Sequence, residues 1–202
     1  MSTIDATSKT AVRGSSDSAP ESKTLHVFLT RGIIAIAWAA VFAAACGSLT
    51  TTVTVGVGVL LVLYPLIDAV ASLIDARSQH GSARKLLLTN AGGSTIAAVA
   101  LGVAATGNVA NVATVFGVWA FVSGAAQFVT AIRRRVLLGN QWPMLLAGGV
   151  SVVFGLAYVL AAAGGQPKLR MIAVYAATGG IDFVIQALLL ARRRRRPAGH
   201  VW

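Results

Sequence analysis

Two carboxylates stand well inside long apolar runs of this 202-residue chain, away from the ends of the runs, where an ionisable side chain is unusual. Asp68 lies in the run 55–76 and Asp182 in the run 171–191, and no Lys or Arg lies at a matching depth. An Asp at the centre of a membrane helix costs about 2.5–3.5 kcal/mol on insertion scales. Such a carboxyl group is either a proton or cation site or a packing element held by neighbouring polar groups. The sequence leaves both interpretations open.

Other polar side chains recur at helical spacing in three of the runs, so that each set falls on one helix face. These polar faces are not expected to contact apolar lipid. They should face the interior of the helix bundle or an interface in a homo-oligomer. We expect the two acids to be neutral and to donate hydrogen bonds to Ser123, to Gln127 or to each other. The sets are Asp68, Ser72 and Asp75; Ser123, Gln127 and Thr130; and Thr178, Asp182 and Gln186. The candidate intramembrane site comprises Asp68, Asp182, Ser123, Gln127 and Gln186.

The same runs offer little for enzymatic catalysis. No His or Cys stands in a run beside a carboxylate, so a nucleophile–base pair within the bundle is excluded. The spacing of metal ligands is absent as well. We therefore expect a protein that is not an enzyme and that has no cofactor and no metal.

The composition is that of a membrane protein. Hydrophobic residues make up 56% of the chain and charged residues 11%, whereas soluble domains carry about 25% charged residues. The mean hydropathy is +0.75. A net charge of +11 would suggest a nucleic-acid partner for a soluble protein, but here the basic residues form short clusters between apolar runs. We expect the lipid bilayer as the partner, and no nucleic acid.

Six continuous apolar runs follow a polar N-terminal tail. Each run can cross a hydrocarbon layer about 30 Å thick as one helix, and the short connections make neighbouring helices antiparallel. Because the runs do not alternate, a β-barrel is excluded. We predict an all-α polytopic membrane protein with a disordered polar tail (1–26), a membrane domain (27–191) and a basic tail (192–202). The transmembrane helices are expected at about 28–46, 55–76, 86–105, 112–132, 143–163 and 171–191.

Basic residues are distributed unevenly over the connections. The segments 77–85 and 133–142 and the C-terminal tail hold eleven of them, whereas the opposite side holds only Lys168 and Arg170. An excess of Lys and Arg belongs in the cytoplasm. Both termini are therefore predicted to be cytoplasmic.

Two arginine clusters on the predicted cytoplasmic side are also candidates for contact with anionic lipid head groups. Each Lys or Arg close to an anionic membrane surface contributes about 1 kcal/mol to binding. The simplest interpretation of the C-terminal cluster is a stop-transfer anchor, to which lipid binding is an addition. The candidate residues are Arg133, Arg134, Arg135, Arg192, Arg193, Arg194, Arg195 and Arg196.

An internal repeat relates the second, fourth and sixth runs. Tyr64, Trp119 and Tyr175 are 55 and then 56 residues apart, and Ala91-Gly92-Gly93 recurs 56 residues later as Ala147-Gly148-Gly149. A fixed period of this size indicates a duplicated supersecondary unit. We predict that the six transmembrane helices are built from three repeated helical hairpins, each starting and ending in the cytoplasm. The repeated motifs are Tyr64-x-x-x-Asp68-Ala69, Trp119-x-x-x-Ser123-Gly124 and Tyr175-x-x-x-Gly179-Gly180, and each of these runs ends in arginine.

Three hairpins with these motifs resemble the HdeD family of small bacterial acid-resistance membrane proteins. The resemblance covers about residues 28–196, and the first repeat departs from it at Ala69, where Gly is usual, and at Pro65. It implies a multi-pass protein of the bacterial plasma (inner) membrane with a link to acid stress. It supplies no catalytic residues.

Two mechanisms therefore compete for such a bundle. In one it is a structural or lipid-organising component of stress tolerance, and the acids are packing features. In the other it is a small proton- or cation-conducting pore or carrier that uses the intramembrane Asp residues. A packed, dry centre favours the first mechanism, and a wet cavity that reaches Asp182 favours the second.

Small residues are expected at the helix contacts, because membrane helices associate by close approach rather than by exclusion of water. Ala120 and Gly124 share one helix face, and Gly148 and Gly155 share another. We expect nearly all of the 21 glycines to serve such contacts.

Overall fold

The computed structural model describes residues 18–47, 52–138 and 142–195, without the side chains of 18–24, 133–138 and 193–195. Within this part the chain forms six α-helices and no strand, and each helix is long and apolar enough to cross a membrane. This confirms the all-α, six-span prediction. The helices are α2 (Ser18–Cys46), α3 (Val55–Arg77), α4 (Gly81–Ala105), α5 (Val109–Leu138), α6 (Trp142–Ala163) and α7 (Arg170–Arg195).

Several helices extend beyond the predicted apolar runs. Helix α2 begins at Ser18, so residues 18–26, which we expected in the disordered tail, are helical. Helix α7 likewise continues through the first arginines to Arg195. An apolar run shows which part of a helix contacts lipid. The backbone hydrogen bonds of the helix can extend beyond that part until a cap or a turn ends the helix.

Two compact units divide the chain, and the division falls within α2 and α7. The first unit comprises Met1–Ile36 and Thr178–Trp202, and the second comprises Ala37–Ala177. In the first unit α2 and α7 pack closely at two glycines, since a methyl group added at Gly32 would lie 2.8 Å from the Gly180 carbonyl oxygen. The Phe28 and Phe183 rings are 6.1 Å apart.

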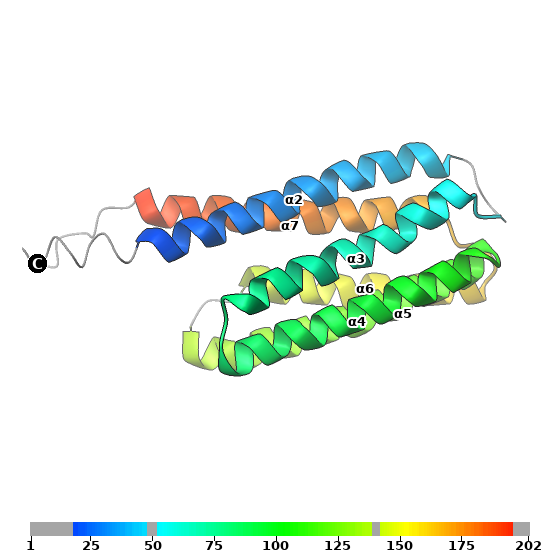
Figure 1. The fold of residues 1–202 in the computed structure, drawn as a ribbon. Coiled ribbons are helices and arrows are strands. Elements are labelled where there is room, and N and C mark those ends of the chain that lie inside the picture. Colours follow the sequence, from blue (N-terminus) through cyan, green and yellow to red (C-terminus); the bar gives the residue numbers. More distant parts are fainter. Residues whose placement is uncertain (1–17, 48–51, 139–141, 196–202) are drawn as a thin grey trace, which may run out of the picture. The chain divides into compact units, whose positions relative to one another are not determined.

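In the second unit the helices α3 to α6 pack against their neighbours along the chain (Figure 1). The most extensive contacts join α5 with α6 and α3 with α4, and α4 also contacts α5. In the predicted repeat, α3 and α4 belong to different hairpins, and so do α5 and α6. Only the α4–α5 pair corresponds to one predicted hairpin. The arrangement in three repeated hairpins stays a prediction.

Glycine allows the close approach of α5 and α6. A methyl group added at Gly155 would lie 2.5 Å from the Gly117 carbonyl oxygen, and one added at Gly124 would lie 2.9 Å from the Gly148 carbonyl oxygen. The predicted contact roles of Gly124, Gly148 and Gly155 are thus confirmed. The wider expectation for nearly all glycines is wrong, because a methyl group would meet nothing within 4 Å at Gly47, Gly56, Gly81, Gly92, Gly93, Gly165 and Gly179. Three of these glycines have positive φ, where the absence of a Cβ relieves backbone strain: Gly47 (φ 42°), Gly81 (φ 60°) and Gly165 (φ 70°).

A cluster of aromatic rings fills the centre of the second unit. Phe116 is fully buried, and its ring centroid lies 5.4 Å from those of Trp119 and Tyr175 and 6.2 Å from that of Tyr64. The three aromatics that share the repeat position, Tyr64, Trp119 and Tyr175, therefore all contact Phe116. We call the whole set the aromatic core: Trp38, Phe42, Tyr64, Phe116, Trp119, Phe154, Tyr158 and Tyr175.

Candidate functional site

Asp68 lies in a hydrogen-bonded polar cluster where α3 meets α4. Its Oδ2 atom accepts one hydrogen bond from the Asn90 amide at 2.8 Å and another from the Ser94 hydroxyl at 2.8 Å. The Asn90 amide also donates to the Ser72 hydroxyl at 2.9 Å. Asp68, Ser72, Asn90 and Ser94 are called the polar cluster below.

Helical spacing builds this cluster from two turns of each helix. Asp68 and Ser72 are four residues apart on α3, and Asn90 and Ser94 are four residues apart on α4, so each pair shares one face. Ser72 and Ser94 are each only 1% exposed, and Asp68 and Asn90 are half-buried. A contact between two apolar helices is thereby held by side-chain hydrogen bonds, which contribute about 0.6 kcal/mol each in membrane proteins.

The geometry limits what the Asp68 carboxyl group can do. The Asn90 amide and the Ser94 hydroxyl both donate to Oδ2, so this one oxygen links α3 to two side chains of α4. The other oxygens that take part in these hydrogen bonds are the Ser72 and Ser94 hydroxyls, because Asn90 contributes its NH₂ group. Hydroxyl and carboxyl oxygens suit a proton or a hard cation rather than a transition metal. Among the described residues no group of three or more His, Cys, Asp or Glu is placed to hold a metal ion.

Asp182, the second acid, lies in the first unit. It is half-buried, and its Oδ2 accepts a hydrogen bond from the Gln186 amide one turn further along α7, at 2.5 Å. Both residues belong to the polar set predicted on this helix, and the hydrogen bond joins them. The partner is on the same helix rather than across an interface, so the contact satisfies the carboxyl group without joining two helices.

The remaining candidate residues lie in different parts of the chain. Ser123 and Gln127 lie half-buried on α5, whereas the hydrogen bonds to Asp68 Oδ2 come from α4. Arg192 is exposed at the end of α7. The side chains of Arg133, Arg134, Arg135, Arg193, Arg194, Arg195 and Arg196 lie outside the described part, so the lipid contact stays a prediction.

Asn90 and Ser94 are the members of the cluster that we did not anticipate. We had searched for polar stripes on the second, fourth and sixth helices and passed over the third. The signal was available, because Asn90 and Ser94 are polar residues four positions apart in an apolar run. The sequence did not show how α4 is rotated about its axis, and this rotation directs Asn90 and Ser94 toward Asp68.

The polar groups of the aromatic core are mostly satisfied within the second unit. The Tyr175 hydroxyl donates to the Ser151 hydroxyl at 3.1 Å, the Tyr158 hydroxyl to the Lys168 carbonyl at 2.9 Å, and the Trp38 indole to the Leu60 carbonyl at 3.1 Å. The buried Trp119 indole nitrogen has no hydrogen-bond partner among the described residues.

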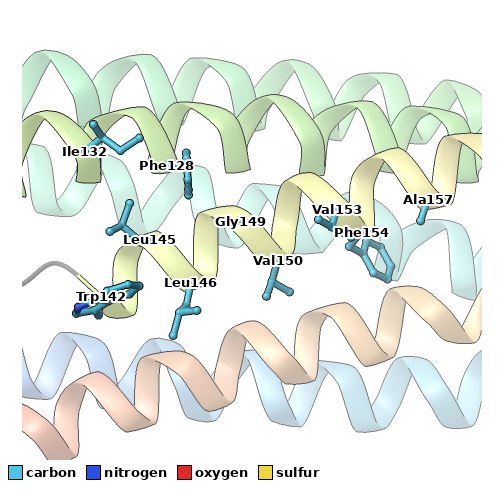
Figure 2. A pocket seen from close by; sticks show the side chains of 10 residues that line it. All are labelled: Phe128, Ile132, Trp142, Leu145, Leu146, Gly149, Val150, Val153, Phe154 and Ala157. Atoms are coloured by element: carbon cyan, nitrogen blue, oxygen red, sulfur yellow. The ribbon is translucent and has the colours of Figure 1, made fainter.

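The second unit also carries an apolar groove of about 870 Å³ along α5 and α6 (Figure 2). Helix α5 contributes Phe128 and Ile132, and α6 contributes residues from Trp142 to Ala157. None of the residues that line it belongs to the polar cluster. The groove is therefore a separate feature from the candidate polar site.

Residues 94–160 match the family model described as a short repeat of unknown function, DUF308. The match covers the second half of α4, all of α5 and most of α6. No match was found among curated proteins or among solved structures. The finding fits a membrane-protein family of unknown function.

The DUF308 segment contains some of the features described above and omits others. The apolar groove and the close glycine contacts of α5 and α6 lie wholly within it. Asp68 and Asn90 lie outside it, and Ser94 is its first residue. The polar cluster is thus a feature of this chain that extends beyond the matched repeat.

Proposed function

We propose that this protein is a multi-pass protein of the bacterial inner membrane that supports acid or general stress tolerance without catalysing a reaction. Six helices suited to span a membrane and the DUF308 match support the location and the type of protein. The resemblance of the motif Trp119-x-x-x-Ser123-Gly124 to the HdeD family supports the link to acid stress.

The aromatic core is the main observation in favour of a structural role for the protein over ion conduction. An ion path through the second unit would need polar side chains or water along its centre. Instead Phe116, Val112 and Ala120 on α5 are fully buried among aromatic rings. A packed apolar centre of this kind stabilises a bundle and opposes the passage of ions.

The test is survival under acid challenge. A strain lacking the gene should survive less well, and the wild-type protein should restore survival. Asp68→Asn and Asp182→Asn should restore it as well, because an amide retains the size of the acid and one oxygen that can accept the hydrogen bonds made by Oδ2. Equal survival with and without the wild-type protein, under acid and under other stresses, would refute the proposed role.

A second candidate function is proton or cation transport, which the polar cluster favours. Asp68 offers a carboxyl oxygen beside two hydroxyl groups and an amide within a membrane helix. Purified protein in liposomes should give no proton or sodium flux above that of empty liposomes if the structural role is correct. A flux that Asp68→Asn abolishes, while Ser123→Ala leaves it intact, would establish transport in its place.

The orientation is proposed from the distribution of basic residues, with both termini in the cytoplasm. Reporter fusions after residues 139 and 166 should report opposite compartments, with 139 in the cytoplasm. The two connections lie at opposite ends of α6, so the same compartment for both fusions would contradict the six-span topology. Anionic lipid head groups are the proposed partners on the cytoplasmic side.

A further inference from the structure

The apolar groove has the dimensions of a site for one lipid chain. It extends from Trp142 to Ala157 on α6, fifteen residues or about 22 Å at 1.5 Å per residue. One leaflet supplies about half of a hydrocarbon layer about 30 Å thick. The groove can therefore follow a chain through its whole leaflet.

The lining of the groove suits an acyl chain. Leu146 and Val153 are 61% and 69% exposed along its length, and Gly149 lies midway between them without a side chain (Figure 2). A methyl group added at Gly149 would lie 3.7 Å from the Phe128 ring, an ordinary van der Waals contact, so a methyl group fits there and the Phe128 ring borders the recess. In lipid such a recess gains van der Waals contacts when a flexible chain fills it.

Charge complementarity identifies the kind of lipid. Phe128 and Ile132 are the residues of α5 that line the groove. Arg135 follows them by seven and three residues, so helical periodicity places it on the same face of α5, one turn beyond Ile132. Arg134 falls on the opposite face. Trp142, at the same end of the groove, is a residue type enriched at membrane interfaces.

We propose that the groove of α5 and α6 binds one acyl chain of an anionic phospholipid, with the head group at the Arg135 end. The proposal rests on the proposed membrane location and names a lipid ligand for it. It differs from general attraction to the basic clusters, because the groove holds one lipid at a defined place.

Native mass spectrometry of the full-length protein, extracted in a mild detergent, tests the acyl-chain site. The wild type should retain one anionic phospholipid per chain, and Gly149→Leu, which fills the recess, should reduce that adduct at least tenfold. Gly93→Leu is the matched control, since Gly93 occupies the same repeat position on α4 and has nothing within 4 Å. It should retain the adduct.

A second pair of variants tests the head group. Arg135→Gln should lower the preference for anionic over zwitterionic phospholipid about fivefold, which corresponds to about 1 kcal/mol per charge. Arg134→Gln removes the same charge from the opposite face and should change the preference less. Equal effects of the two variants would reduce the contact to diffuse surface charge and overturn the head-group assignment.

Further outcomes keep the acyl-chain site open to refutation. Should Gly149→Leu not fold, Val153→Trp fills the groove from an exposed position and should displace the lipid in the same way. An adduct that survives both variants would overturn the proposal, as would a dimer that Gly149→Leu converts to monomer, because a second copy would then occupy the groove. Acid survival is measured in a separate experiment. A failure of the lipid-site proposal can therefore be distinguished from a failure of the proposed role in stress tolerance.

Discussion

Phe116→Ala should destabilise the protein more than truncation to alanine of any other aromatic side chain in the second unit. The Phe116 ring is fully buried and lies within 6.5 Å of five other rings, those of Tyr64, Trp119, Phe154, Tyr158 and Tyr175. Truncating a buried Phe to Ala costs about 3–5 kcal/mol through lost contacts and the cavity left behind. Reversible unfolding in mixed micelles should show a loss of that size in the free energy of unfolding.

Phe121→Ala is the matched control on the same helix. The Phe121 side chain is 40% exposed, although its backbone lies at the contact with Gly155 of α6. Its truncation therefore removes contacts with lipid and leaves a smaller cavity than truncation of Phe116. We expect a change within about 0.5 kcal/mol, as for other surface positions. If Phe116→Ala and Phe121→Ala cost the same, the aromatic core would not be the stabilising centre of the second unit.

Gly155→Ala should separate α5 from α6. The added methyl group would lie 2.5 Å from both the Gly117 carbonyl oxygen and the Phe121 backbone nitrogen. Because these are backbone atoms, rotation of a side chain cannot relieve the clash, and one helix must move. Overpacking costs about 1–3 kcal/mol and sometimes more. The free energy of unfolding should fall by that amount, and the DUF308 segment should become more accessible to protease between α5 and α6.

Gly93→Ala serves as the control for Gly155→Ala. Gly93 is exposed on α4, with nothing within 4 Å of an added methyl group. Replacing a glycine inside a helix by alanine stabilises it by about 0.5–1 kcal/mol when there is room. A destabilising Gly93→Ala, or a neutral Gly155→Ala, would contradict the close packing described for α5 and α6.

The six helices and their membrane-spanning character could be predicted from the sequence. Lipid offers no partner for backbone N–H and C=O groups, so a continuous apolar run of sufficient length has to form a helix that satisfies them internally. The ends of the helices were less predictable. Residues 18–26 and Arg192–Arg195 are helical although they are polar, because apolarity reports contact with lipid and not the hydrogen bonding of the backbone.

Only the tertiary structure showed which face of each helix packs against its neighbour. Helices that are apolar nearly all round have no strong amphipathic face to set their rotation about the helix axis. Gly92 and Gly148 share a repeat position, yet only Gly148 contacts another helix closely. Asp68 was recognised from its burial in an apolar run, but its partners Asn90 and Ser94 were not. Packing of α4 against α3 sets the rotation that brings those three side chains together, and single-helix periodicity carries no information about that rotation.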